Sequence, residues 1–111
     1  MPIMSIVNQA KGPLPITATF TAPSDGPAAF VLSGSVWGQS ANQMIGVTIQ
    51  LDGTTIGSAQ IWSNGAATHR AVVPSYIPVT LTLAAHKVTL VATNANSISD
   101  LNDWFNVVLL Y

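Results

Sequence analysis

Polar side chains that could do chemistry are concentrated in one stretch of the sequence. Within ten residues the chain places side-chain acceptors and amide donors at Asn94, Asn96, Asp100, Asn102 and Asp103. Carboxylate and amide oxygens are ligands that suit Ca²⁺. The spacing matches no defined calcium loop, however, and Asx residues also fill turns by bonding to their own backbone. We therefore predict no metal site, with calcium binding at Asp100 and Asp103 as the alternative.

Side chains suited to catalysis are scarce. Asp100 and Asp103 are close enough in sequence to be considered as an acid–base pair, but no flanking histidine, glutamate or nucleophile accompanies them. His69 and His86 are far apart in sequence, and even if they met across a sheet, a tetrahedral zinc site needs three or four ligands. The chain contains no cysteine and no glutamate. We therefore predict that the protein is not an enzyme and has no cofactor.

Tryptophans are the third group of candidate residues. Trp37, Trp62 and Trp104 each lie at the end of a predicted strand beside Gly, Ser or Asp. A sugar site needs an aromatic face for the apolar side of the ring, and amides or carboxylates for its hydroxyls. Tryptophan at a strand end also commonly fills a core or an interface. The predicted ligand-binding residues are Trp37, Trp62, Asn94, Asn96, Asp100, Asn102, Asp103 and Trp104.

The chain carries very little charge. Of its 111 residues, 49% are hydrophobic and only 6% are charged, with a formal net charge of −1. About a quarter of the residues of a soluble domain are normally charged, so this surface repels its neighbours weakly and self-association is expected. Three scattered cations cannot follow a phosphate backbone, and no apolar run is long enough to span a membrane. Neither nucleic acid nor a membrane is therefore expected as a partner.

The first residues suggest where the chain is made. Met1 to Met4 lack a basic segment followed by a long apolar stretch, so no secretory signal is expected. This favours synthesis in the cytoplasm, with leaderless release or assembly into a particle. The absence of cysteine leaves the final compartment open.

Strands must position these side chains. The terminal run from Trp104 to Tyr111 is rich in β-branched and aromatic residues, which predicts a strand buried on both faces in the middle of a sheet. Asp52-Gly53 lies between two alternating runs and predicts a hairpin with a type I′ turn. Gly34 indicates a bulge or a close backbone approach. Further strands are predicted at 3–7, 16–22, 29–37, 46–51, 54–62, 71–73, 79–83 and 87–93.

Prolines and turn residues punctuate these runs. Pro74 should stop one short strand, and Pro78 should open the next. About eight short strands with turn signals every eight to twelve residues are typical of a β-sandwich or barrel. No segment shows a helical period of useful length. The sequence therefore predicts one all-β domain over residues 1–111, built as an antiparallel β-sandwich.

The order of these signals resembles a known family. Phe20-Thr21-Ala22-Pro23-Ser24-Asp25-Gly26 is similar to an aromatic strand that ends in Pro-x-x-Gly, and Ile49-Gln50-Leu51-Asp52-Gly53 to a Val-x-Leu-x-x-Asn-Gly hairpin. The end, Phe105 to Tyr111, is similar to Phe-x-Gly-x-Leu-Leu-Tyr, although Asn106 and Val107 depart from the glycine pattern. The chain thus resembles the C1q/TNF-like jelly-roll family. That resemblance implies a trimer of jelly rolls packed by an apolar face and used for binding.

Two functions are compatible with these observations. The first is a non-catalytic binding module, a homotrimeric lectin-like or protein-recognition domain whose loops recognise a glycan or a protein partner. The second is a structural subunit of a virion, fibre or surface assembly, in which the loops only make contacts within the assembly. Low charge and abundant Thr, Ser and Asn suit both functions.

Overall fold

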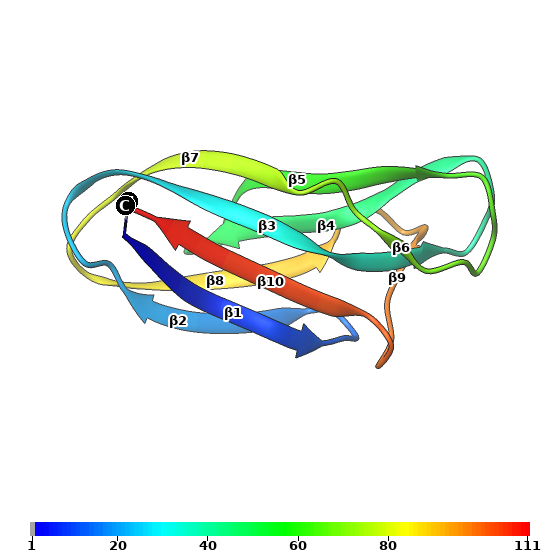
Figure 1. The fold of residues 1–111 in the computed structure, drawn as a ribbon, viewed down its shortest axis with the longest axis horizontal. Coiled ribbons are helices and arrows are strands. Elements are labelled where there is room, and N and C mark those ends of the chain that lie inside the picture. Colours follow the sequence, from blue (N-terminus) through cyan, green and yellow to red (C-terminus); the bar gives the residue numbers. More distant parts are fainter. Residues whose placement is uncertain (1) are drawn as a thin grey trace.

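The computed structural model describes residues 2–111, which form two antiparallel β-sheets packed face to face (Figure 1). Eight strands are long and two, β6 and β9, have two residues each. Residues 2–111 form no helix that could cross a membrane. The strands are β1 (Ile3–Lys11), β2 (Ile16–Thr21), β3 (Gly26–Gly38), β4 (Gln43–Leu51), β5 (Thr54–Ser63), β6 (Arg70–Ala71), β7 (Ser75–Leu81), β8 (Ala85–Ala92), β9 (Ser97–Ile98) and β10 (Trp104–Leu110).

The strand order is that of a jelly roll. In the first sheet β1 pairs with β10 and β10 with β3, and β3 also pairs with β7, β6 and β9. The second sheet has the order β2-β8-β4-β5. Most consecutive strands lie in different sheets, so the chain crosses the sandwich repeatedly. The predicted all-β antiparallel sandwich is confirmed.

The core lies between the two sheets because alternate residues of each strand point inward. In β3 these are Phe30, Leu32 and Val36, all fully buried, and in β4 Ile45, Val47 and Ile49. The predicted close approach at Gly34 is confirmed: a Cβ atom there would lie 2.5 Å from Cδ1 of Phe105. The Asp52-Gly53 hairpin is also confirmed, since both residues have the positive φ angles of a type I′ turn (51° and 85°).

The terminal strand β10 lies in the middle of the first sheet, between β1 and β3, as predicted. The prediction that it is buried on both faces is wrong. Phe105, Val107 and Leu109 are fully buried, but Asn106, Val108 and Leu110 are only half-buried on the outer face. The reason is that residues 2–111 form only two sheets, and they place no second layer on the outer face of the first one.

Several predicted strand boundaries are also wrong; the first strand, expected at 3–7, runs to Lys11. The short strand expected at 71–73 is Arg70–Ala71, and β7 runs through Pro78 instead of beginning there. Pro78 lies opposite Ala29 of β3, and β7 is an edge strand, so the missing N–H of the proline faces away from the ladder.

His86 forms a hydrogen bond to Asp52 in the turn between β4 and β5. Asp52 accepts hydrogen bonds from the Lys87 backbone N at 2.8 Å and from His86 Nδ1 at 2.6 Å, while His86 Nε2 donates to the Thr82 carbonyl at 2.9 Å. The hydrogen bond to Asp52, and then the one to Thr82, raise the pKa of His86 above its usual value. The same bond from His86, together with the Lys87 N–H, lowers the pKa of Asp52.

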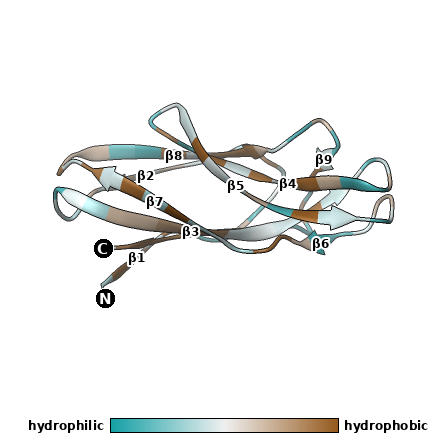
Figure 2. Ribbon diagram, turned by 90° about the horizontal axis from the view of Figure 1, so that it is seen from above, coloured by the Kyte–Doolittle hydropathy of each residue, from teal (hydrophilic) through white to brown (hydrophobic). Residues whose placement is uncertain are grey.

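The two ends of the sandwich differ. Pro2 and Tyr111 lie together at one end, where the Tyr111 backbone N donates to the Pro2 carbonyl at 3.1 Å (Figure 2). The opposite end holds β6, β9 and the beginning of β10 (Figure 1). The polar stretch of residues 94–103 lies at that opposite end, between β8 and β10.

Candidate functional site

The asparagines of the polar stretch hold it against the β3–β4 connection. Asn96 Oδ1 accepts from the Ser40 backbone N at 2.7 Å, and Asn96 Nδ2 donates to the Ser40 carbonyl at 3.2 Å. Asn94 Nδ2 donates to the Met44 carbonyl at 3.0 Å, and Asn94 Oδ1 accepts from Ser97 Oγ at 2.8 Å. These predicted ligand-binding side chains are therefore engaged within the protein.

Asp103 is fully buried and lies directly before β10. Its Oδ1 accepts from Ser35 Oγ at 2.8 Å and lies 2.7 Å from His69 Nδ1, while its Oδ2 accepts from the Asp100 backbone N at 2.9 Å. Both oxygens of this carboxyl are therefore engaged within the protein. A ligand arriving from solvent would not reach this side chain without opening the loop.

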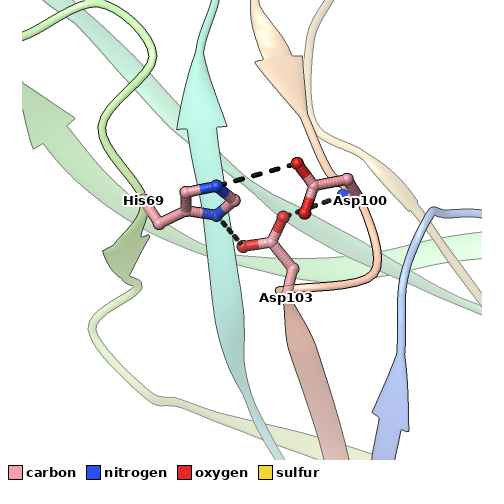
Figure 3. A group of neighbouring side chains, drawn as sticks. All are labelled: His69, Asp100 and Asp103. Atoms are coloured by element: carbon pink, nitrogen blue, oxygen red, sulfur yellow. Dashed lines mark hydrogen bonds and ion pairs between the residues drawn. The ribbon is translucent and has the colours of Figure 1, made fainter.

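His69 joins Asp103 to Asp100 (Figure 3). Its Nε2 lies 3.7 Å from Asp100 Oδ2, and both side chains are partly open to solvent. The hydrogen bond to Asp103, with the charges of both carboxylates, raises the pKa of His69 against the opposing effect of burial. His69, Asp100 and Asp103 each offer one atom that could be a metal ligand, and these three atoms lie within 4.8 Å of one another. We call these three residues the histidine–aspartate cluster.

The histidine–aspartate cluster does not have the order of a nucleophile–base pair. Ser35 Oγ and His69 Nδ1 both bond to the same oxygen of Asp103, Oδ1, so the Ser35 hydroxyl donates its hydrogen to the carboxylate and not to the imidazole. Sequence reasoning missed the role of His69, which is 34 residues from Asp103 and reaches it only because β6 pairs with β3.

The three tryptophans do not share one surface. Trp37 is half-buried in β3, with its ring centroid 6.2 Å from that of His69. Trp104 is 43% exposed at the start of β10, and Lys11 Nζ lies 5.2 Å from the centroid of its ring. Trp62 is 51% exposed in β5 of the other sheet. Asn102 is exposed near Asp100, whose Oδ1 accepts from the Asn102 backbone N at 2.8 Å.

Trp62 lies on the outer face of the second sheet. Its indole Nε1 donates to Asn64 Oδ1 at 2.7 Å, and it lies opposite the exposed Met44 of β4. The register places Gln60 and Ser58 on the same face as Trp62. We call this surface the Trp62 face; it comprises Met44, Thr48, Ser58, Gln60, Trp62 and Thr93.

Hydroxyl groups on the Trp62 face are fixed by a local network. Thr48 Oγ1 lies 2.7 Å from Ser58 Oγ and 3.0 Å from Thr93 Oγ1. Gly46 makes room for this arrangement, since a Cβ atom there would lie 2.8 Å from Gln60 Cγ and 3.0 Å from Thr93 Oγ1. Among residues 2–111 the Gln60 amide has no hydrogen-bond partner. Because side chains alternate between the two faces of a strand, the sequence of β5 already places Gln60 and Ser58 on the same face as Trp62. That spacing could have identified them as candidate ligand-binding residues.

Comparison with known proteins places the fold. No known family model matches the sequence, and no characterised protein matches it at significant sequence similarity. Among solved structures, the tripod from the baseplate of bacteriophage Tuc2009 has a TM-score of 0.63 at 20% identity over 97% of this chain and 62% of that one. A family 35 carbohydrate-binding module from Clostridium thermocellum has a TM-score of 0.54 at 15% identity over 97% and 89%.

The fold is that of these jelly-roll domains. A β-glucosidase from Paenibacillus barengoltzii also contains it, with a TM-score of 0.57 at 13% identity over 98% of this chain. The chain spans only 10% of that β-glucosidase and 62% of the baseplate protein. Such neighbours support a β-sandwich without singling out the C1q/TNF-like family.

Proposed function

We propose that the protein is a non-catalytic module that binds an uncharged glycan at the Trp62 face and works as a homotrimer. The observation that carries this proposal is the half-exposed Trp62 ring, held by Asn64 beside the unpaired amide of Gln60. An aromatic face and a nearby amide are the two groups that a sugar ring needs. Several of the structural neighbours are carbohydrate-binding modules, which supports the same class of ligand.

Preorganisation favours the Trp62 face over the polar stretch that the sequence points to. The buried Thr48 hydroxyl holds those of Ser58 and Thr93 in place, so a sugar would meet two partly exposed hydroxyls that are already oriented. In the polar stretch, Asn94, Asn96 and Asp103 use their side-chain groups internally. Asp100, Asn102 and Trp104 remain open to solvent there and form the competing site.

A glycan array on the purified protein tests this function, with variants at both exposed tryptophans. Trp62→Ala should abolish the sugar signal, and Gln60→Ala should weaken it. Trp104→Ala is the matched control, because it removes an equally exposed indole from the other sheet, and it should retain binding. A signal lost in Trp104→Ala but kept in Trp62→Ala would move the site to the polar stretch. The absence of any defined sugar signal would refute glycan binding.

The homotrimer is proposed from the outer face of the first sheet. This face exposes Ile3 (66%) and Tyr76 (60%), and Val108 lies half-buried between them, opposite Val31 of β3. A hollow of about 350 Å³ adjoins them, lined by Pro27, Ala28, Ala29, Tyr76, Pro78, Leu110 and Tyr111. Exposed apolar side chains gathered on one sheet face mark an interaction site in soluble proteins. The resemblance to C1q/TNF-like jelly rolls supports three copies meeting there.

Sedimentation equilibrium at micromolar concentration tests the oligomer. We expect three times the monomer mass, and a monomer of 11.6 kDa would refute the trimer. Tyr76→Glu should shift the population toward monomer, because it places a charge on the apolar face. Leu83→Glu is the matched control, since Leu83 is equally exposed (61%) but lies in the β7–β8 turn.

A structural subunit of a phage or fibre assembly is the second candidate function. The likeness to the Tuc2009 baseplate tripod, at a TM-score of 0.63, favours it. The apolar sheet face would serve this function equally well. A trimer that forms in solution but shows no signal on the glycan array would favour the structural subunit over the binding module.

A further inference from the structure

His69 directs one nitrogen at the Asp100 carboxylate, within ion-pair range but beyond hydrogen-bond distance. Its Nδ1 carries the hydrogen, because the Asp103 carboxylate 2.7 Å away can only accept. The other nitrogen, Nε2, therefore has a free lone pair in the neutral ring. It lies 3.7 Å from Asp100 Oδ2, which is too long for a hydrogen bond. Two acceptor atoms thus point toward each other (Figure 3), and both side chains are partly exposed.

Neighbouring groups hold both acceptors in place. Asp103, fixed by Ser35 and the Asp100 backbone N, sets the tautomer and orientation of the His69 ring. Asp100 Oδ1 accepts from the Asn102 backbone N at 2.8 Å, which leaves its Oδ2 free to face His69. A carboxylate that accepts from the far nitrogen of a histidine is the usual partner of a metal-binding imidazole.

We infer that His69 Nε2 and Asp100 Oδ2 bind a borderline divalent metal ion such as Zn²⁺, with water completing its coordination. Ligands of zinc lie about 2.0–2.2 Å from the ion, so two of them at a tetrahedral angle are about 3.3–3.6 Å apart. The separation of 3.7 Å between the two atoms needs only a small adjustment to meet that value. Asp103 is a positioning residue in this site and does not contact the ion.

The choice of metal follows from the donor atoms. Imidazole suits zinc, copper and nickel, whereas calcium takes six to eight oxygen ligands. A calcium site at Asp100 and Asp103 would need oxygens of Asp103, which are buried and already bonded. The structure therefore favours a nitrogen-containing site over the calcium alternative suggested by the sequence. This inference is independent of glycan binding and of the trimer.

Titration of ¹⁵N-labelled protein with ZnCl₂, followed through the imidazole nitrogens by NMR, tests the site. We expect a saturable shift of His69 Nε2 and none of His86, because both nitrogens of His86 are already bonded. His69→Gln should abolish zinc binding, Asp100→Asn should weaken it, and His86→Gln is the matched control that retains it. Asp103→Asn should lower affinity by about 10–100-fold, as expected of a residue that orients a metal ligand.

Several results would overturn the inference. They are a wild-type titration with no saturable shift at His69, equal zinc binding in His69→Gln, and uptake of zinc at His86. Saturable binding of CaCl₂ that survives His69→Gln would assign the space to calcium instead. The wild-type spectrum decides the question by itself if a variant does not fold.

Discussion

Replacing Leu109 by alanine should strongly destabilise the fold. Leu109 is fully buried in β10, and its register neighbours are Phe30 in β3 and Met4 in β1. The substitution removes three buried carbon atoms, which lose about 2.4 kcal/mol of transfer free energy at about 0.8 kcal/mol each. A cavity between two sheets closes only partly, so the total loss of unfolding free energy should be about 3–5 kcal/mol.

Urea denaturation followed by tryptophan fluorescence measures this loss. Leu101→Ala is the matched control, because the same atoms are removed from a side chain that is 68% exposed, and it should cost less than about 0.5 kcal/mol. All proteins must be compared at one concentration, since an oligomer gains stability by mass action. A loss below about 1 kcal/mol for Leu109→Ala would mean that β10 does not form the centre of the core, and the strand order above would have to be abandoned.

Two further predictions concern buried and paired charges. Folding raises the pKa of His86 above 6.5, so its contribution to stability is complete below that pH and is lost as the pH rises through the folded-state value. Folding lowers the pKa of Asp52 below 3.8, so its contribution is present above that pH and is lost as the pH falls through the folded-state value. The thermal midpoint should therefore be highest between about pH 4 and pH 6.5. In the His86→Gln variant, the midpoint should fall less as the pH rises above that range. If the midpoints of the wild type and of His86→Gln fall equally steeply with rising pH, the Asp52–His86 pair does not stabilise the fold. Asp103→Ala should cost about 2–4 kcal/mol in urea denaturation, because it leaves the Ser35 hydroxyl and the Asp100 N–H without an acceptor, whereas Asp100→Ala should cost less than about 1 kcal/mol. Equal midpoints for these two variants would show that the burial of Asp103 has no energetic importance.

Much of the fold follows from local patterns in the sequence. Apolar Val47 and Ile49 alternate with polar Thr48, and Asp52-Gly53 follows them in the sequence. This local pattern predicts the hairpin of β4 and β5 without information from any other strand. The central place of β10 follows from its composition. Its half-exposed outer face does not, because Val108 and Leu110 are as apolar as the residues that face the core, and composition cannot show whether a second layer is present.

The candidate site was harder to predict from sequence. Asn94, Asn96 and Asp103 have the same side-chain chemistry whether they bind a ligand or hold a loop, and only the positions of Ser40, Met44 and Ser35 decide between these roles. The pairing of His69 with Asp103 depends on β6 lying against β3, a contact for which no local pattern exists. Trp62 was identified as a candidate, but its neighbour Gln60 was not.

The hydrogen bond between Tyr111 and Pro2 has a mechanical consequence. Because β1 and β10 are antiparallel neighbours that bring the termini to one end, a force pulling the two termini apart would act on their ladder one hydrogen bond at a time. Peeling of this kind resists force much less than sliding strands past each other, which breaks many bonds together. A module tethered through both ends should therefore open first along β1, leaving the second sheet intact, whereas tension between the polar end and either terminus would load whole strands lengthwise. Single-molecule pulling in these two directions would measure the difference, and equal rupture forces would contradict the strand pairing on which it depends.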